Sequence, residues 1–213
     1  VFLRADVAWR LGPRPVALAL AGRGPWARAW LRWRLPGARP DPLAGADIRP
    51  LWERHRWAEL PLAADPAALA RAWLAAHPPY AGPLWACGQE AALRLLHLLL
   101  GCALCGGEPP ADAVRVLARR VAANPWYAAA QDNNHPVSEA AALWAAGHGR
   151  GKARLLRAIM RLVDGEGGFA QPSPAYARLL LDVASVAEWL ARRRGDGLPP
   201  AALARLAAAT RLL

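Results

Sequence analysis

The chain has 213 residues and a formal net charge of +11 at pH 7, and Lys152 is the only lysine among its 27 basic residues. This length suits one sizeable domain, and no apolar stretch approaches the ~18 uncharged residues of a membrane-spanning helix. Ala and Leu are abundant while runs of Val, Ile and Thr are rare, which argues against a strand-rich domain. The positive charge favours polyanionic partners, although GC-rich coding also produces an Arg-rich composition.

Residues 1–46 form an N-terminal arm that is rich in Arg, Trp and Pro. Trp26, Trp30 and Trp33 recur at helical spacing, so we expect them on one face of a short helix. Such a face more commonly packs into a core than binds a ligand. A proline-rich stretch over residues 36–42 then predicts a loop that separates this arm from the rest of the chain.

Residues 47–213 read as successive helices with short connections, and we interpret them as one helical domain. Asp65 and Pro66 pair a capping residue with a first-turn proline, and Gly147 suits a helix C-terminus. No alternating strand pattern interrupts the helices. We therefore predict an all-α fold of antiparallel helical hairpins, which can stack as a bundle, a solenoid or a toroid. The expected helices cover residues 50–59, 66–76, 88–105, 110–123, 135–146, 151–163, 174–194 and 199–212.

Three cysteines, Cys87, Cys102 and Cys105, are too few for a disulfide framework. Cys102 and Cys105 form a C-x-x-C pair at the end of the apolar helix expected over 88–105. Neither a second pair nor a nearby histidine accompanies them. We therefore interpret both as small buried residues, reduced and without metal.

An unusually polar segment, QDNNHPVSE over residues 131–139, precedes one of the expected helices. A helix cap needs a single Ser, Asp or Asn, whereas five polar side chains stand here before the helix begins. This excess indicates a ligand site, and an Asn-rich capping loop is the alternative.

A second polar segment, GFAQPSPAY over residues 168–176, precedes the helix expected over 174–194. Ser173 is the predicted N-cap, which places Tyr176 in the first turn, close to the positive end of the helix. A phenol in that position is suited to proton transfer. The alternative is a tyrosine that only packs on a neighbouring helix.

Both segments resemble signatures of the heparinase II/III-like polysaccharide lyases. QDNNHPVSEAAAL over 131–143 resembles their N-N-H-x-x-x-E-A-x-x-L signature, and DGEGGFAQPSPAY over 164–176 resembles their D-G-x-F-x-Q-x-S-x-x-Y segment. WACGQEAALR over 85–94 and DIRPLWERHR over 47–56 resemble two further segments of the same group. The order and spacing of the four segments make the resemblance specific.

The resemblance implies an α/α toroid followed by an antiparallel β-sandwich, so the chain is expected to hold an incomplete toroid with the β-sandwich absent. It further implies β-elimination of uronate-containing polysaccharides, such as glycosaminoglycans or alginate, without a cofactor and in a periplasmic or secreted setting. The C5 proton of a uronate is weakly acidic while the carboxylate is charged. Donors must therefore neutralise the carboxylate, a base must take the proton, and an acid must protonate O4.

Carried over position by position, the resemblance assigns Asn134 and His135 to the substrate carboxylate and the sugar. It assigns Tyr176 to proton donation, with proton abstraction as a further role. It assigns no metal ligand. It places six other residues in contact with substrate or in supporting positions: Asn133, Gln89, Glu90, Arg94, Glu139 and Gln171.

Two departures from the family pattern indicate low activity. Ala177 stands where the family commonly has a histidine after the tyrosine, and no β-sandwich follows Leu213. We therefore expect a lyase domain that binds acidic polysaccharide and is weakly active alone. A non-catalytic glycan-binding or scaffold protein of the same fold is the alternative. A nucleic-acid-binding protein is not expected, because charge alone supports it and no known binding motif is present.

Overall fold

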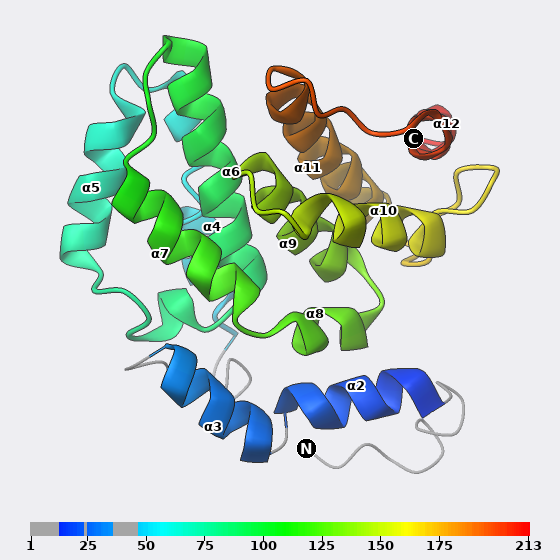
Figure 1. Cartoon of the computed structure of the whole chain (residues 1–213), viewed down its shortest axis with the longest axis horizontal. Coiled ribbons are helices and arrows are strands. Elements are labelled where there is room, and N and C mark those ends of the chain that lie inside the picture. Colours follow the sequence, from blue (N-terminus) through cyan, green and yellow to red (C-terminus); the bar gives the residue numbers. More distant parts are fainter. Residues whose placement is uncertain (1–12, 24, 36–46) are drawn as a thin grey trace.

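The computed structural model describes residues 13–23, 25–35 and 47–213. These residues form helices, and their one β-type pairing is an isolated bridge between Val163 and Phe169 (Figure 1). The predicted all-α fold is confirmed, and none of the described helices is long and apolar enough to cross a membrane. The α-helices are α2 (Pro13–Arg23), α3 (Pro25–Arg34), α4 (Arg49–Arg54), α5 (Pro66–Ala76), α6 (Gly88–Cys105), α7 (Ala111–Ala122), α8 (Pro125–Gln131), α9 (Asn134–Ala145), α10 (Gly151–Leu162), α11 (Pro174–Arg192) and α12 (Pro200–Arg211), and the 3₁₀ helices are η1 (Leu60–Leu62) and η2 (Pro83–Trp85).

Helix α9 lies at the centre of the fold. Ten of its 12 residues are buried, and it contacts α6, α7, α8, α10 and α11. Small residues at 140–142 let these neighbours approach closely, and Gly151 at the start of α10 lies against the backbone of Trp144, where a Cβ would come within 2.3 Å of its nitrogen. Successive helices in contact, such as α6 with α7 and α9 with α10, form the expected hairpins (Figure 1). Their closure into a toroid stays a prediction.

Local sequence signals set several helix ends. The Asp65 carboxylate accepts a hydrogen bond from the backbone N–H of Ala68 at 2.8 Å and so caps α5 as predicted. Gly106 ends α6 in the left-handed region, with φ of 73°. Ser173 occupies the N-cap position of α11, but its side chain makes no capping hydrogen bond. The predicted position of this helix start is therefore right and the predicted capping contact is wrong.

Helix α8 is not among the helices expected from the sequence. Asn124 accepts a hydrogen bond from the backbone N–H of Tyr127 at 3.1 Å, and Pro125 occupies the first turn. The same two residues that end α7 therefore start a new short helix at once. The helix expected over 50–59 also ends early, at Arg54, and Trp57 takes a left-handed φ of 62°.

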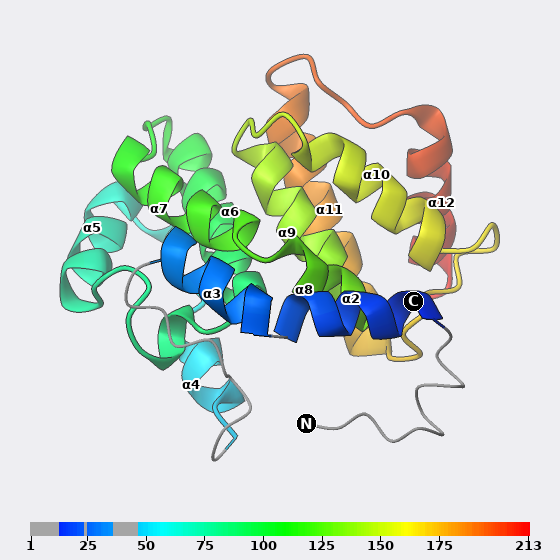
Figure 2. The same ribbon diagram turned by 60° about the horizontal axis from the view of Figure 1, so that its bottom comes forward.

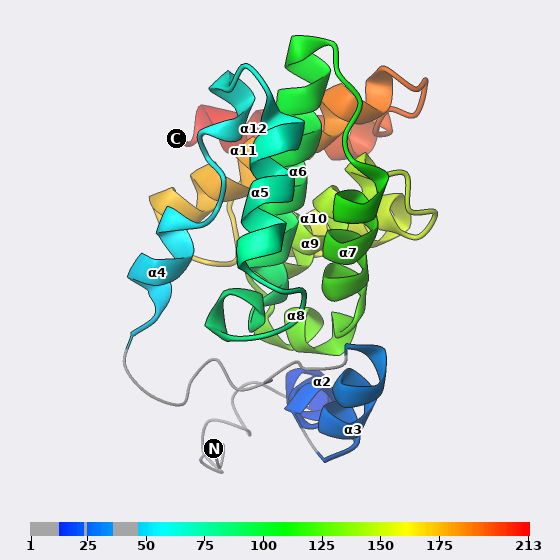
Figure 3. The same cartoon turned by 90° about the vertical axis from the view of Figure 1, so that its left-hand side faces the viewer.

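The described part of the N-terminal arm packs on the helical domain, with α2 alongside α8 (Figures 2 and 3). Trp30 donates its indole N–H to the backbone oxygen of Ala123 at 3.0 Å, and Leu31 joins the hydrophobic core. Trp26 and Trp33, however, are 87% and 67% exposed. Trp30 itself is 40% exposed. The expectation of a core-facing tryptophan stripe is therefore wrong, because α3 contributes Ala27 and Leu31 to the buried side.

The C-x-x-C pair is split between core and surface. Cys102 is buried, whereas Cys105 is exposed, and both are free thiols in the structure. The expectation of two buried cysteines is wrong for Cys105, because it lies in the last turn of α6, where the chain leaves the core at Gly106. The Cys105 thiol donates to the backbone oxygen of Cys102.

Candidate functional site at a polar junction of four segments

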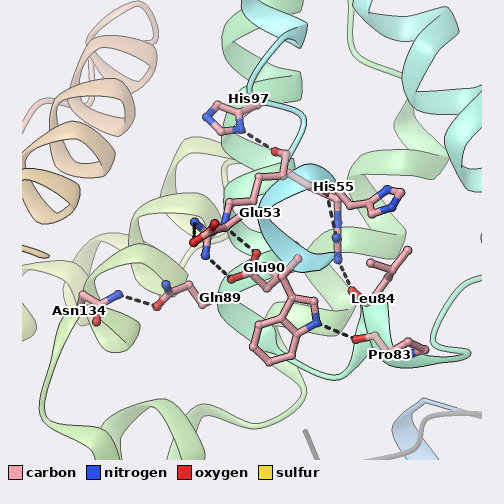
Figure 4. Close-up of polar contacts among 11 residues, drawn as sticks. Glu53, His55, Pro83, Leu84, Gln89, Glu90, His97 and Asn134 are labelled. Carbon is pink, nitrogen blue, oxygen red and sulfur yellow. Dashed lines mark hydrogen bonds and ion pairs between the residues drawn. The ribbon is translucent and has the colours of Figure 1, made fainter. Parts of the chain in front are cut away.

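Three separate polar segments meet at the side chain and backbone of Asn134. Its amide nitrogen donates to the Gln89 side-chain oxygen at 2.8 Å, a contact drawn in Figure 4. Its backbone N–H points to the Gln171 side-chain oxygen at 3.3 Å. Asn134 is only 2% exposed, so these bonds hold α6, α9 and the segment before α11 together in the protein interior.

A partly buried ion pair brings the fourth segment to the same place. Arg56 donates to both carboxylate oxygens of Glu90, from Nε and Nη2, at 2.8 Å each, and Glu90 is 2% exposed. This two-pronged geometry offsets part of the desolvation cost of burying a charge pair. The Arg56 backbone oxygen in turn contacts a ring nitrogen of His97 at 2.7 Å (Figure 4).

We call this set of side chains the polar junction. It contains Arg56, Gln89, Glu90, Asn134 and Gln171. Each of the four sequence segments contributes at least one member, although the segments are distant along the chain. Gln89 and Glu90 lie side by side at the start of α6, so they link the amide contacts to the ion pair.

Arg94 binds backbone oxygens of the segments next to the junction. It is fully buried, donates to the backbone oxygens of His55 at 3.2 Å and Leu84 at 2.6 Å, and lies over the rings of Trp73 and Trp85. Burial lowers the pKa of Arg94 to about 10, which leaves it charged at neutral pH. Its donors hold the backbone around η2, so it occupies a supporting position.

Arg120 holds the same segment and is not among the candidates from the sequence. Its guanidinium donates to the backbone oxygens of Trp85 at 2.6 Å and Ala86 at 2.7 Å. Its spacing along α7 gives no signal, because the surrounding arginines are surface residues and only the fold shows which one is buried.

Several polar side chains of the turn between α8 and α9 have structural partners. Asn133 caps α9 by accepting from the backbone N–H of His135 at 2.9 Å, and its amide donates to Gln131 at 3.2 Å. Asp132 takes a left-handed φ of 45° and forms a two-pronged ion pair with Arg161. The capping role considered as the alternative for this segment is therefore present, alongside the junction that Asn134 makes.

His135 is held in a neutral environment. Burial lowers its pKa to about 4. The ring is therefore uncharged at neutral pH, and it can donate a hydrogen bond from one nitrogen and accept one at the other. Its Nδ1 lies 3.5 Å from the Gln131 amide nitrogen, and its ring stands edge-on to that of Tyr127, with the centroids 6.4 Å apart.

Tyr176 lies in the first turn of α11, as predicted, and is 39% exposed. No hydrogen bond or ring contact joins Tyr176 to His135. The two segments are linked instead through Gln171 and Asn134, so the predicted meeting of Asn134, His135 and Tyr176 in one cleft stays a prediction.

Glu139 makes none of the hydrogen bonds or ion pairs of the junction and lines a separate cavity. It is 6% exposed, its Oε1 lies 2.6 Å from where a Cβ on Gly88 would stand, and it lines a cavity of about 380 Å³ between α2, α7, α8, α9 and α10. Burial raises the pKa of Glu139 to about 8, and the charges of Arg120 and Arg154 counteract part of that rise.

Comparison with known proteins adds no relative. No family model matches the chain, and no curated protein or solved structure matches it. Within the described ranges, no group of three or more His, Cys, Asp or Glu side chains is placed to hold a metal ion.

Proposed function

We propose that the chain is the helical domain of a heparinase II/III-like polysaccharide lyase and that it acts on uronate-containing acidic polysaccharide by β-elimination. The observation that carries the proposal is the polar junction. Four segments selected on sequence signatures alone, over residues 47–56, 85–94, 131–143 and 164–176, are joined there by hydrogen bonds and an ion pair.

The reaction divides between groups on α9 and α11. A base takes the C5 proton, the electron pair forms the C4–C5 double bond, and the bond from C4 to O4 breaks as an acid protonates O4. Tyr176, exposed at the start of α11, is the proposed proton donor. His135 is uncharged at neutral pH, so its ring N–H is available to donate a hydrogen bond to the substrate carboxylate.

The polar junction positions these groups. Asn134 precedes His135 directly and is anchored to Gln89, while Gln171 stands five residues before Tyr176 and contacts the Asn134 backbone. The junction therefore sets the relative position of the starts of α9 and α11. In the described conformation the Asn134 amide is buried. Its proposed contact with the substrate carboxylate therefore requires the structure to open at the N-terminal end of α9.

Low turnover is part of the proposal. Ala177 removes an imidazole that the family commonly supplies beside the tyrosine, and loss of one well-placed acid or base costs about 10²- to 10⁴-fold in rate. The positive charge of the chain, +11, favours binding of an acidic polymer even where the chemistry is slow.

The test is the ultraviolet absorbance of unsaturated uronate during incubation with alginate, heparan sulfate, hyaluronan and glucuronan. We expect slow turnover of at least one polymer and a loss of about 10²-fold or more in Tyr176→Phe. Tyr80→Phe is the matched control, because it removes a hydroxyl that binds only the Val116 backbone oxygen. Equal activity in Tyr176→Phe and the unmodified protein would reject the role of Tyr176.

A non-catalytic acidic-glycan-binding protein is the second candidate. The burial of Asn134 and the alanine at position 177 favour it. It predicts salt-sensitive binding of the same polymers with no absorbance change, and binding that Tyr176→Phe leaves intact.

A further inference from the structure

The cavity lined by Glu139 is separate from the polar junction. It has a volume of about 380 Å³, within the range of small-molecule sites, and its walls come from α2, α7, α8, α9 and α10. On α9, Pro136, Glu139, Ala140 and Leu143 line it at helical spacing. None of the five junction residues lines it. Most of the remaining wall is apolar, with leucine, alanine, proline and tryptophan side chains.

Four arginines and two acids provide the charges of the cavity. Arg14 and Arg161 both form ion pairs with Asp132. Arg154 and Arg157, one turn apart on α10, line the cavity. Within the described ranges, neither guanidinium group forms an ion pair or a hydrogen bond. Four positive and two negative side chains leave the wall positive even with both acids ionised.

Glu139 is the buried acid of this wall. It is 6% exposed, and no described residue donates a hydrogen bond to its carboxyl group. The residue lines the cavity, so a ligand bound there can supply a hydrogen-bond partner for the carboxyl group. With burial favouring its protonated form, the carboxyl group is a hydrogen-bond donor that faces the same space as Arg154 and Arg157.

We propose that this cavity binds a small organic anion, with Arg154 and Arg157 on its carboxylate, Glu139 as a hydrogen-bond partner, and the apolar wall around its hydrocarbon body. Guanidinium groups are the preferred partners of carboxylates. The apolar lining selects against a purely inorganic anion, because sulfate or phosphate has no surface to bury there. This site is independent of the elimination chemistry proposed for the polar junction.

Calorimetric titration with octanoate tests the proposal, with octanol and inorganic sulfate as comparison ligands. We expect saturable octanoate binding that is at least tenfold tighter than that of either comparison ligand. The double variant Arg154→Gln, Arg157→Gln should weaken octanoate binding at least tenfold. Arg115→Gln, an exposed arginine of α7 outside the cavity, is the matched control and should bind octanoate as the unmodified protein does.

A cavity-filling variant separates binding from folding. Ala129→Phe places a ring in the cavity and leaves every arginine in place, so it should abolish octanoate binding while circular dichroism shows an unchanged helical fold. Equal binding of octanol and octanoate would overturn the proposal. So would sulfate binding as tight as octanoate binding, unaltered affinity in the double variant, or the absence of octanoate binding at millimolar concentration.

Discussion

At the scale of single residues, buried ionisable groups set how the stability of the protein depends on pH. Glu139 has a raised pKa, about 8, because burial penalises its carboxylate. Between the ordinary pKa of about 4.5 and that value, the unfolded chain has lost this proton while the folded chain still holds it. The folded state is therefore progressively destabilised as pH rises through this range, and the effect levels off above it.

Glu139→Gln removes that dependence. We expect the variant to gain free energy of unfolding relative to the unmodified protein as pH rises from 5 to 8, by roughly 1.4 kcal/mol for each pH step of one within that interval. Urea denaturation at a series of pH values measures it. A stability difference that stays constant across this range would contradict the raised pKa.

His135 has the opposite effect on the pH dependence of stability. Burial lowers its pKa to about 4, so between pH 6.5 and 4 the unfolded chain binds a proton that the folded chain does not, and stability falls as pH falls. His135→Gln should lose less stability than the unmodified protein over this range. Thermal melting at pH 7, 5.5 and 4.5 measures it, and parallel losses in both proteins would refute the lowered pKa of this partly buried ring.

At the scale of secondary-structure elements, close helix crossings depend on glycine. Gly151 begins α10 against α9, where a Cβ would stand 2.3 Å from the Trp144 nitrogen and 2.6 Å from its Cα. Gly151→Ala must push the two helices apart, which costs about 1–3 kcal/mol. Chemical denaturation measures this loss.

Gly149→Ala is the control for that crossing. It lies two residues away in the same turn, has no neighbouring atom within 4 Å of a Cβ and has an ordinary φ. It should leave the free energy of unfolding within about 0.5 kcal/mol of the original. Equal losses in both variants would mean that the α9–α10 contact is looser than described.

Helices were predictable where a capping residue and a turn signal agree. Asp65 and Pro66 start α5 as the sequence indicates, and α6 spans the expected residues 88–105. The sequence does not distinguish a stop from a stop followed by a new start, so Asn124–Pro125 conceals α8. It also does not show which side of α3 is buried, since its tryptophans have the spacing of a core face and yet are largely exposed.

The candidate site was predictable as a set of segments, and its internal contacts were not. Signatures pointed to Gln89, Asn134 and Gln171, which the structure joins. Glu139 lies in the same signature but faces a different cavity, because a helix that is buried on all sides presents neighbouring residues to different partners. Arg120 carried no signal, since its burial is a property of the packed fold.

At the scale of the whole molecule, helix α9 connects the two proposed sites. Its first residue, Asn134, belongs to the polar junction. The side of α9 that carries Pro136, Glu139, Ala140 and Leu143 lines the arginine-rich cavity. Asn134→Ala should destabilise the protein by about 1–3 kcal/mol, since the buried Gln89 oxygen then loses its donor. Octanoate binding should stay unchanged in this variant at temperatures where it remains folded, and calorimetric titration measures it.

The central claim, β-elimination of a uronate polymer, is tested most directly by the mass of the fragments. After prolonged incubation with alginate or glucuronan, mass spectrometry should find oligosaccharides whose new non-reducing end is an unsaturated uronate, lighter by one water than the hydrolysis product. These fragments should disappear in Tyr176→Phe and persist in Tyr80→Phe. Fragments with saturated ends, or intact polymer in every case, would contradict the account.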